Sequence, residues 1–243
     1  MQIIKLNATD STNLYLKELM NSKSLEDYTI VVTDEQKSGR GQMGTKWESN
    51  PFKNLTFSIL KKLKSRNVTN PFELNICVSL AIYNLLNRHQ IPDLAIKWPN
   101  DIMSGNFKIC GILIENLLAG NRMLASVIGI GLNVNQVVFN NLPNVSSLKL
   151  LMGKTYNLDR LLDEFQSILK QIFLEWDEKG AIEMRKKYEN VLFRKDKPST
   201  FKDIDGNMFM GFIRGVSTEG RLVVALEDDV NKEFDMKAIR LLY

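Results

Sequence analysis

The 243-residue chain is long enough for one large domain with a small appendage, or for two modest domains. Its 44% hydrophobic and 25% charged residues are typical of globular proteins and exclude an intrinsically disordered chain. A net charge of +4 does not by itself indicate a nucleic-acid-binding protein. Between Lys37 and Arg66, however, eight basic residues face one acidic residue, and this local excess favours an anionic ligand near that segment.

The cysteines and the apolar runs bear on where the protein works. Cys77 and Cys110 lie in apolar runs 33 residues apart, a spacing typical of neither a disulfide framework nor a metal cluster, so we interpret both as reduced core residues. No run approaches the roughly 18 apolar residues of a membrane span, and the N-terminal segment lacks the apolar stretch of a secretion signal. A cytoplasmic protein without a membrane partner is predicted.

The first third of the chain alternates short strands with helices. In chain order we expect a strand over 3–6, a helix after the capping residues 10–13, a buried strand over 29–33, a long loop over 34–47, a strand over 55–60 and a helix over 70–89. The second of these helices begins with Asn70 as its cap, Pro71 at its first position and Glu73 at its third, which is the pattern of a helix start.

Three apolar runs in the middle of the chain predict an antiparallel meander. These runs, 95–103, 108–115 and 123–131, are separated by the turn signals Gly105-Asn106 and Gly120-Asn121. We therefore expect three neighbouring strands here.

The last third changes from helices to short strands. Apolar residues recur at helical spacing from Leu161 to Trp176 behind the cap Asn157, and a second helix is expected to end near Leu192. After Phe193, short alternating segments separated by turn residues predict a small barrel-like module. The expected domains are therefore 1–192 and 193–243.

The glycine-rich segment 36–44, with the sequence QKSGRGQMG, is a candidate anion-binding loop. Glycines let the backbone approach a ligand, and the planar guanidinium of Arg40 suits a carboxylate or a phosphate. The segment is not the phosphate loop of P-loop enzymes, which requires GxxxxGK followed by Ser or Thr. A flexible surface loop is the alternative interpretation.

The segment KWPND, residues 97–101, presents a lysine at the end of an apolar strand. Burying a lysine is costly, so we expect Lys97 to point into a cleft, with Asn100 and Asp101 displayed where Pro99 interrupts the strand. An edge strand with a solvated lysine is the alternative.

Glycines in the apolar runs indicate close approach to the backbone. Gly111 weakens its strand unless something packs against it, and an ideal hairpin would pair it with Asn100 and leave room there for a ligand. The segment 129–135 offers the same choice between a ligand contact and a tight turn. Because His89 is the single histidine, neither a Ser/His/Asp triad nor a histidine-rich metal site is favoured.

Taken in order, DSTN, EQKSGRGQMG with Trp47 behind it, KWPND, KICGILIE and GIGLNVN resemble the catalytic domain of biotin protein ligases over residues 7–135. The strands after residue 193 are similar to the C-terminal domain of that family. The resemblance implies an α/β (α+β) fold, with a class II aminoacyl-tRNA synthetase-like catalytic domain and a C-terminal SH3-like β-barrel. It also implies an enzyme that makes biotinyl-5′-AMP from biotin and ATP with Mg²⁺. Biotin would then pass to one lysine of the biotin carboxyl carrier domain of acetyl-CoA carboxylase or another biotin-dependent carboxylase.

The resemblance assigns roles to individual residues. Arg40 and Lys97 would be catalytic, with Lys97 bridging the biotin carboxylate and the α-phosphate. The biotin-binding residues would be Ser11, Thr12, Asn13, Gln36, Gly39, Arg40, Gly41, Gln42, Lys97 and Gly111. The nucleotide-binding residues would be Arg40, Trp47, Lys97, Asn100, Asp101 and Asn133. The metal ligands stay open, with Asp101 as the candidate.

Two features separate this chain from other members of that family. Gln42 stands where many members carry a second arginine, so we hypothesise that retention of the adenylate rests on Arg40 and Lys46. The catalytic pattern begins within a dozen residues of Met1, so we expect a ligase without a DNA-binding domain, with no DNA partner, as a monomer or homodimer.

Two alternatives are weighed against this interpretation. A lipoate protein ligase has a similar fold and adenylation logic, but its arginine- and glycine-rich motif with a nearby histidine is not seen. A non-catalytic biotin-binding sensor is disfavoured because both Arg40 and Lys97 are retained.

Overall fold

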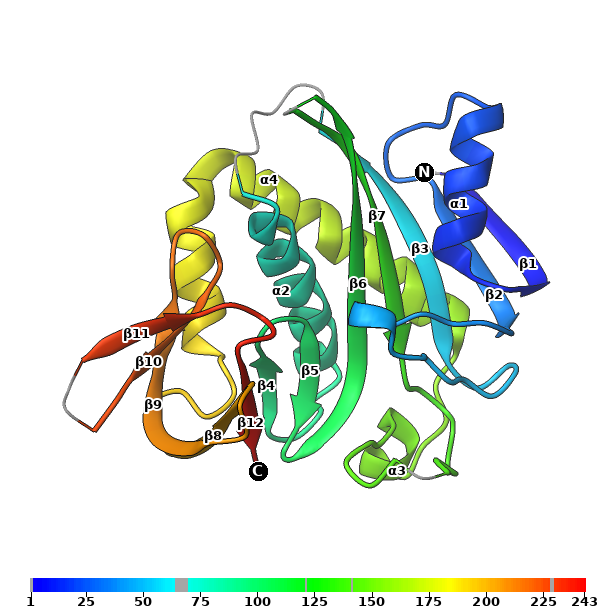
Figure 1. Ribbon diagram of the computed structural model, residues 1–243. Helices are drawn as coiled ribbons and strands as arrows, with labels where there is room; N and C mark the ends of the chain where they lie inside the picture. The colour runs from blue at the N-terminus through cyan, green and yellow to red at the C-terminus, as the bar shows by residue number, and fades with distance from the viewer. Residues whose placement is uncertain (1, 64–69, 121, 141, 228–229) are drawn as a thin grey trace.

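The computed structural model describes residues 2–63, 70–120, 122–140, 142–227 and 230–243 (Figure 1). Its larger sheet has seven strands in the order β1-β2-β3-β7-β6-β5-β4. They are β1 (Ile3–Thr9), β2 (Ile30–Gln36), β3 (Leu55–Lys62), β4 (Leu94–Lys97), β5 (Asp101–Ser104), β6 (Phe107–Ala119) and β7 (Arg122–Leu132). β1 pairs with β2 in parallel, and the other neighbours in this sheet pair antiparallel.

Helices cover both faces of the large sheet (Figure 1). α1 (Thr12–Ser22) packs on one face, against β2, β3 and β7. α2 (Phe72–Arg88) and α4 (Leu158–Asn190) pack together on the other face. β3 lies between the layers, with Phe57 in the main core and Leu60 in the smaller cluster under α1. Because both faces of β3 are covered, residues 55–60 are all buried, including the polar Thr56 and Ser58.

The helix starts follow the capping residues expected from the sequence. The side chains of Ser11, Asn70 and Asn157 each accept a hydrogen bond from a backbone N–H two or three residues further on, at 3.4, 2.9 and 2.9 Å. Pro71 already has a helical φ of −57°, so the second helix begins as predicted.

A break divides α4 in two. Gly180 has φ 78° and ψ 173°, so the helical conformation stops there and resumes at the next residue. This confirms the prediction of a long helix followed by a second one. A short helix, α3 (Leu148–Met152), precedes them. Despite the length of α4, none of the helices in the described ranges is both long and apolar enough to cross a bilayer.

The apolar run 95–103 forms two strands, so the expectation of one strand was wrong. β4 and β5 pair antiparallel as a hairpin, with Lys97 opposite Asp101, and the turn between them contains a cis Trp98–Pro99 peptide. Proline donates no backbone hydrogen bond, and the Asn100 side chain instead donates to the backbone of β6, at 2.6 Å from the Ile112 oxygen. β5, β6 and β7 form the expected meander.

The register of β5 on β6 differs by one residue from the expected one. Gly111 pairs with Asp101, and Asn100 is one residue away. The two-residue turn Gly105-Asn106 is present as predicted, but Ile109 is an extra residue in β6 that forms a β-bulge. A bulge places two residues of one strand opposite one of its partner, which shifts all pairing beyond it.

A five-stranded antiparallel sheet follows, in the order β11-β10-β9-β8-β12. Its strands are β8 (Pro198–Asp203), β9 (Met208–Val216), β10 (Leu222–Ala225), β11 (Asn231–Phe234) and β12 (Ile239–Leu242). The segment that leads into it joins the edge of β4, because Ile96 N donates to Val191 O at 2.8 Å and Phe193 N donates to Ile96 O at 2.9 Å. The domain boundary after residue 192 falls in this segment and stays a prediction.

Candidate active site

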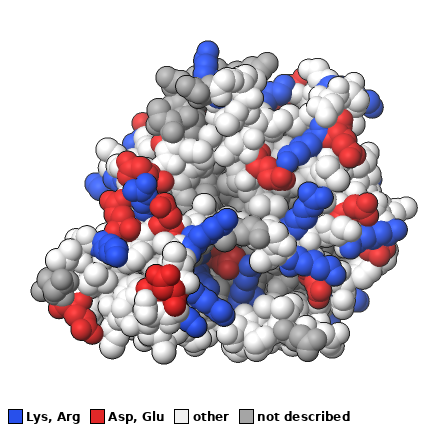
Figure 2. Space-filling view, in the orientation of Figure 1, with Lys and Arg blue, Asp and Glu red and all other residues white. Residues whose placement is uncertain are grey.

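A cavity of about 570 Å³ lies against the large sheet, and one side chain of the C-terminal sheet also lines it. Its wall combines the start of α1, the loop after β2, the β4–β5 turn, parts of β6 and β7, and one side chain from β12. Figure 2 shows a hollow near the middle of the molecule with Lys and Arg atoms around it. The volume lies within the usual range of about 300–1,000 Å³ for small-molecule sites.

Most of the residues expected to bind ligand lie on this wall, although they come from distant segments. They are Ser11, Thr12, Asn13, Gln36, Arg40, Gly41, Gln42, Trp47, Lys97, Asn100, Asp101 and Gly111. The glycine-rich segment and KWPND therefore face the same space, as a site for two joined ligands requires. The loop itself is shorter than expected, because β2 extends to Gln36, and it contains the 3₁₀ helix η1 (Gln42–Gly44).

Two expected residues do not line the cavity. A side chain at Gly39 would place its Cβ 2.4 Å from the backbone oxygen of Trp47, so this glycine lets the loop pack on the segment behind it. Asn133 is 2% exposed, and its Nδ2 donates to the Ser146 oxygen at 3.1 Å. Asn133 therefore lies behind the wall and holds the end of β7 against the following loop.

The cavity wall is strongly cationic. Five basic side chains line it, those of Arg40, Lys46, Lys97, Lys108 and Arg240, together with one acidic side chain, that of Asp101. Asp101 lies opposite Lys97 in the β4–β5 pair, yet its carboxylate pairs with Lys108 at 2.6 Å. Within the described ranges, no carboxylate lies within 4.0 Å of Lys97 or Arg40. Clustered positive charge of this kind raises the local concentration of anions.

Sequence reasoning missed Lys108 and Arg240. Lys108 precedes Gly111 in the same strand, and the bulge at Ile109 helps to set the direction of the Lys108 side chain. Arg240 lies in β12, which reaches the cavity through its pairing with β8 and the docking of the C-terminal sheet. No local sequence pattern marks either residue.

The amide of Gln36 has a fixed orientation. The backbone N–H and the hydroxyl of Thr12 both donate to Gln36 Oε1, at 2.9 and 3.2 Å. Gln36 Nε2 makes no hydrogen bond to any described residue. It is therefore available to donate to a ligand carbonyl on the cavity wall.

Asn13 is held by a partly buried polar network. Its Nδ2 donates to Glu115 at 2.8 Å, its Oδ1 accepts from the Ser58 hydroxyl at 2.5 Å, and Lys17 pairs with Glu115 at 2.5 Å. Burial alone would raise the pKa of Glu115, but hydrogen bonds from Lys17 and Asn13 lower it overall. Ionised Glu115 can only accept a hydrogen bond, so it binds the NH₂ group of Asn13, and the Ser58 hydroxyl donates to the Asn13 oxygen. These two contacts fix the orientation of the Asn13 amide.

The indole of Trp47 covers two glycines of the sheet. Gly111 and Gly131 are cross-strand partners in β6 and β7. A Cβ at Gly131 would lie 2.3 Å from Trp47 Cε2, and one at Gly111 would lie 3.0 Å from Cζ3. The ring therefore fills the space beside Gly111 that was expected to receive a ligand. Trp47 Nε1 and Thr56 Oγ1 are buried without a hydrogen-bond partner in the described part of the chain, so a polar ligand can satisfy them.

Two helices support the β4–β5 turn from behind. Asn75 of α2 donates to the Pro99 oxygen at 2.8 Å, and the Tyr188 hydroxyl of α4 donates to the same oxygen at 3.3 Å. The main chain around Lys97 is therefore fixed by the core.

Comparisons with known proteins agree with this geometry. The model of the biotin/lipoate A/B protein ligase family matches residues 6–133 of the 243. This chain belongs to that family. The resemblance inferred from the motifs is thereby confirmed.

Relatives within the family extend the match. The chain is 25% identical over 235 residues to the bifunctional ligase/repressor BirA of Bacillus subtilis, a match that covers 95% of this chain and 71% of that protein. It is 33% identical over 131 residues to the biotin–[acetyl-CoA-carboxylase] ligase of Paracoccus denitrificans, or 53% of each chain. The biotin protein ligase of Aquifex aeolicus, solved with biotin and ATP, superposes with a TM-score of 0.82 at 26% identity, covering 99% of this chain and 98% of that one. The predicted fold class, with its C-terminal sheet, is confirmed.

The cysteines and the acidic residues restrict other chemistry at this ligase-family site. Cys77 and Cys110 are buried and form no disulfide, as expected, and burial raises the pKa of the Cys110 thiol, which keeps it protonated. Within the described ranges, no group of three or more His, Cys, Asp or Glu side chains could hold a metal ion.

Proposed function

We propose that this chain forms biotinyl-5′-AMP from biotin and ATP and transfers the biotinyl group to one lysine of a biotin carboxyl carrier domain. The observation that carries the proposal is the convergence of Arg40 and Lys97 on one cavity that is also lined by the fixed amides of Asn13 and Gln36. Membership of the ligase family and the likeness to a structure solved with biotin and ATP support it.

The cationic wall matches the first half-reaction. A biotin carboxylate oxygen attacks the α-phosphorus of ATP, and the bond from that phosphorus to the pyrophosphate oxygen breaks. The carboxylate is already ionised at neutral pH, so no general base is required. The main barrier is to bring two anions together and to stabilise the charge that develops, which Arg40 and Lys97 do as preorganised donors.

The polar wall matches the head group of biotin. A ureido ring has one carbonyl acceptor and two N–H donors, so it needs complementary groups of both kinds. The free Nε2 of Gln36 suits the carbonyl, and the Ser11 and Thr12 side chains supply hydroxyl oxygens beside it. We assign Trp47, Asn100 and the neighbouring cations to the nucleotide.

The cavity fits Mg²⁺ carried by ATP. Magnesium is held by one or two carboxylates together with substrate phosphates, and it supplies charge neutralisation for the phosphoryl oxygens. Asp101 is the carboxylate available on this wall, and it now pairs with Lys108. Asp101 and the phosphates would hold the ion.

In the second half-reaction the neutral amine of an acceptor lysine attacks the carbonyl carbon of the adenylate. The bond to the AMP oxygen breaks, AMP leaves, and the amine releases a proton to solvent. Positioning is the chief requirement, because AMP is a good leaving group. We propose that the acceptor is a biotin-dependent carboxylase, with acetyl-CoA carboxylase as the first candidate.

Mass spectrometry of an isolated carrier domain tests the function. Incubation with this protein, biotin and MgATP should add the mass of one biotinyl group, and replacement of the acceptor lysine by arginine should abolish the gain. A parallel reaction with lipoate tests the alternative ligase, and biotin-dependent exchange of pyrophosphate into ATP separates an enzyme from a sensor. A gain with lipoate alone, or no exchange, contradicts the proposal.

We further propose that the 243 residues do not bind DNA specifically. Electrophoretic mobility shifts with the operator DNA of a bifunctional ligase/repressor relative, in the presence of biotin and MgATP, test this part separately. A shift that an unrelated DNA does not compete away contradicts it.

A further inference from the structure

Lys97 makes two contacts with a residue of the C-terminal sheet region. Its Nζ donates a hydrogen bond to the Tyr243 hydroxyl at 3.1 Å and lies 4.5 Å from the centroid of the same ring. Tyr243 directly follows β12, whereas Lys97 ends β4 of the large sheet. One side chain therefore provides both a hydrogen-bond acceptor and an aromatic face to the ammonium.

The Lys97 ammonium must bind anions, so it matters that its partner is a neutral phenol and not a carboxylate. A carboxylate beside Lys97 would neutralise its charge and compete with the substrate oxygens. A phenol holds the ammonium and leaves the full positive charge in place. An ammonium has three N–H donors, and one directed at Tyr243 leaves two for oxygens in the cavity.

Tyr243 is itself held in place next to the strand that carries Lys97. Its ring packs edge-to-face on Phe193, with centroids 5.1 Å apart and planes at 72°. The backbone N–H of Phe193 donates to the Ile96 oxygen at 2.9 Å, and Ile96 precedes Lys97. The contacts therefore close a circuit from β4 through Phe193 and Tyr243 to the end of the Lys97 side chain.

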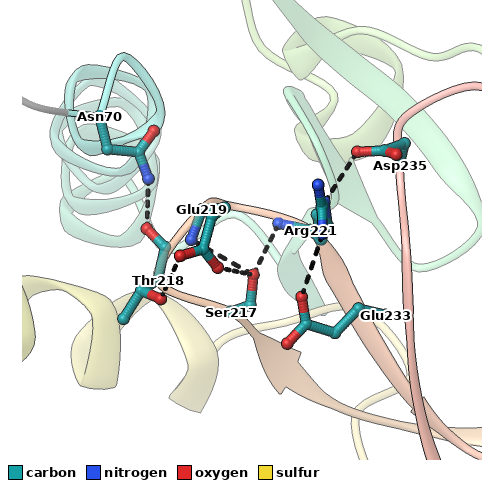
Figure 3. Close-up of polar contacts among 7 residues, drawn as sticks. All are labelled: Asn70, Ser217, Thr218, Glu219, Arg221, Glu233 and Asp235. Carbon is teal, nitrogen blue, oxygen red and sulfur yellow. Dashed lines mark hydrogen bonds and ion pairs between the residues drawn. The ribbon is translucent and has the colours of Figure 1, made fainter.

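The residue on the other side of Lys97 is also bonded to the C-terminal sheet. Trp98 Nε1 donates to the Gly220 oxygen at 2.9 Å, in the loop between β9 and β10. Ser217 folds this loop by accepting from the backbone N–H of Arg221 at 3.3 Å, and Asn70 at the start of α2 donates to the Thr218 oxygen (Figure 3).

The base of the same loop is tied to the strands of its own sheet. Arg221 pairs with Asp235 at 3.0 Å and with Glu233 at 3.8 Å (Figure 3). Of the two sequence neighbours of Lys97, Ile96 is bonded to the segment that leads into the C-terminal sheet, and Trp98 is bonded to a loop of that sheet. These bonds fix the position from which Tyr243 acts.

We propose that Tyr243 is a positioning residue for adenylation, which holds the Lys97 ammonium at the cavity wall without neutralising it. The proposal rests on the proposed function, because it assigns Lys97 to the biotin carboxylate and the α-phosphate. It gives the C-terminal sheet a direct part in the first half-reaction.

The kinetic test is a double-mutant cycle in the pyrophosphate-exchange reaction. Tyr243→Phe keeps the ring and should lower kcat about fivefold, and Tyr243→Leu removes both contacts and should lower it about 30-fold, with little change in the KM for biotin. In a Lys97→Ala background, Tyr243→Leu should have no further effect. Tyr83→Phe, which removes a phenol from α2, is the matched control and should leave kcat unchanged. The same loss with Lys97 absent, or wild-type kcat in Tyr243→Leu, overturns the proposal.

A second readout does not depend on activity. Reductive ¹³C-methylation keeps the lysine charge and gives each lysine its own NMR signal, and loss of a signal in Lys97→Arg assigns the Lys97 resonance. That resonance should be shifted upfield by the Tyr243 ring, should lose the shift in Tyr243→Leu, and should keep it in Tyr83→Phe. An unshifted resonance in the wild type overturns the positioning contact. Absence of biotin-dependent exchange in the wild type contradicts the proposed function. In that case the chemical shift of Lys97 still shows whether Lys97 contacts Tyr243.

Discussion

Replacing Glu115 by alanine should weaken biotin binding, although Glu115 does not line the cavity. Its carboxylate accepts from Asn13 Nδ2 at 2.8 Å, and Asn13 is 5% exposed on the cavity wall. Without the carboxylate, Nδ2 keeps only a contact of 3.4 Å with the Leu113 oxygen. The amide is then free to rotate away from the Ser58 hydroxyl that binds its oxygen.

The expected magnitude follows from the two contacts of Glu115. A hydrogen bond to a charged group contributes about 1.5–3 kcal/mol, whereas an exposed ion pair contributes at most about 1 kcal/mol. The Lys17–Glu115 pair is 33% exposed at both ends, so most of the effect should come from Asn13. The lower end of the first range corresponds to a biotin Kd about tenfold weaker. Glu115→Gln keeps an acceptor for Asn13 and should cost about threefold.

Isothermal titration calorimetry with biotin measures this effect, and the ATP affinity of the same variants should be unchanged. Glu175→Ala is the matched control, because Glu175 accepts from Lys179 at 2.7 Å and Lys187 at 2.5 Å on α4, away from the cavity wall. It should leave the biotin Kd unchanged. An unchanged Kd in Glu115→Ala, with the fold intact by circular dichroism, would refute the reasoning about Asn13.

Four further predictions concern the same cavity. Lys97→Ala should reduce biotin-dependent pyrophosphate exchange at least about 100-fold with an unchanged melting temperature, and full activity would contradict the mechanism. Gln42→Arg adds a cation to the wall and should slow release of the adenylate in filter-binding assays, so an unchanged rate would contradict the role of that position. Gly131→Ala should displace the Trp47 indole, lower stability by about 1–3 kcal/mol in urea melts and change tryptophan fluorescence; an unaltered protein would show that the ring does not rest there. The pKa of Glu115 lies below the ordinary glutamate value of 4.5, so its contribution to biotin affinity should be constant above pH 4.5 and should be lost as the pH falls through the lowered pKa. Calorimetry between pH 7 and pH 4 measures the affinity, and a loss that begins well above pH 4.5 would contradict this prediction.

Much of the fold was predictable because the signals are local. Ser11, Asn70 and Asn157 cap helices through bonds to residues two or three positions away, so short sequence patterns located the helix starts. The same applies to the turn at Gly105-Asn106. The chemistry of the glycine-rich segment and of KWPND was also readable, since it depends on residue types at fixed spacing.

The errors arose where one residue changes the geometry of many. The run 95–103 reads as one apolar strand, yet Pro99 turns it into a hairpin. The extra residue Ile109 then moved Gly111 from Asn100 to Asp101. Neither the hairpin nor the bulge changes the hydrophobic pattern of the sequence, because apolar residues flank both of them.

The sequence by itself determined the ligase family, the two cations Arg40 and Lys97, and the order of strands and helices that carries them. Only the tertiary structure decided which groups surround those cations. Arg240 lines the same cavity and Tyr243 contacts Lys97, because β12 pairs with β8 and the C-terminal region packs beside β4. Such contacts join residues far apart along the chain and depend on how the two sheets pack, so no neighbouring residues in the sequence record them.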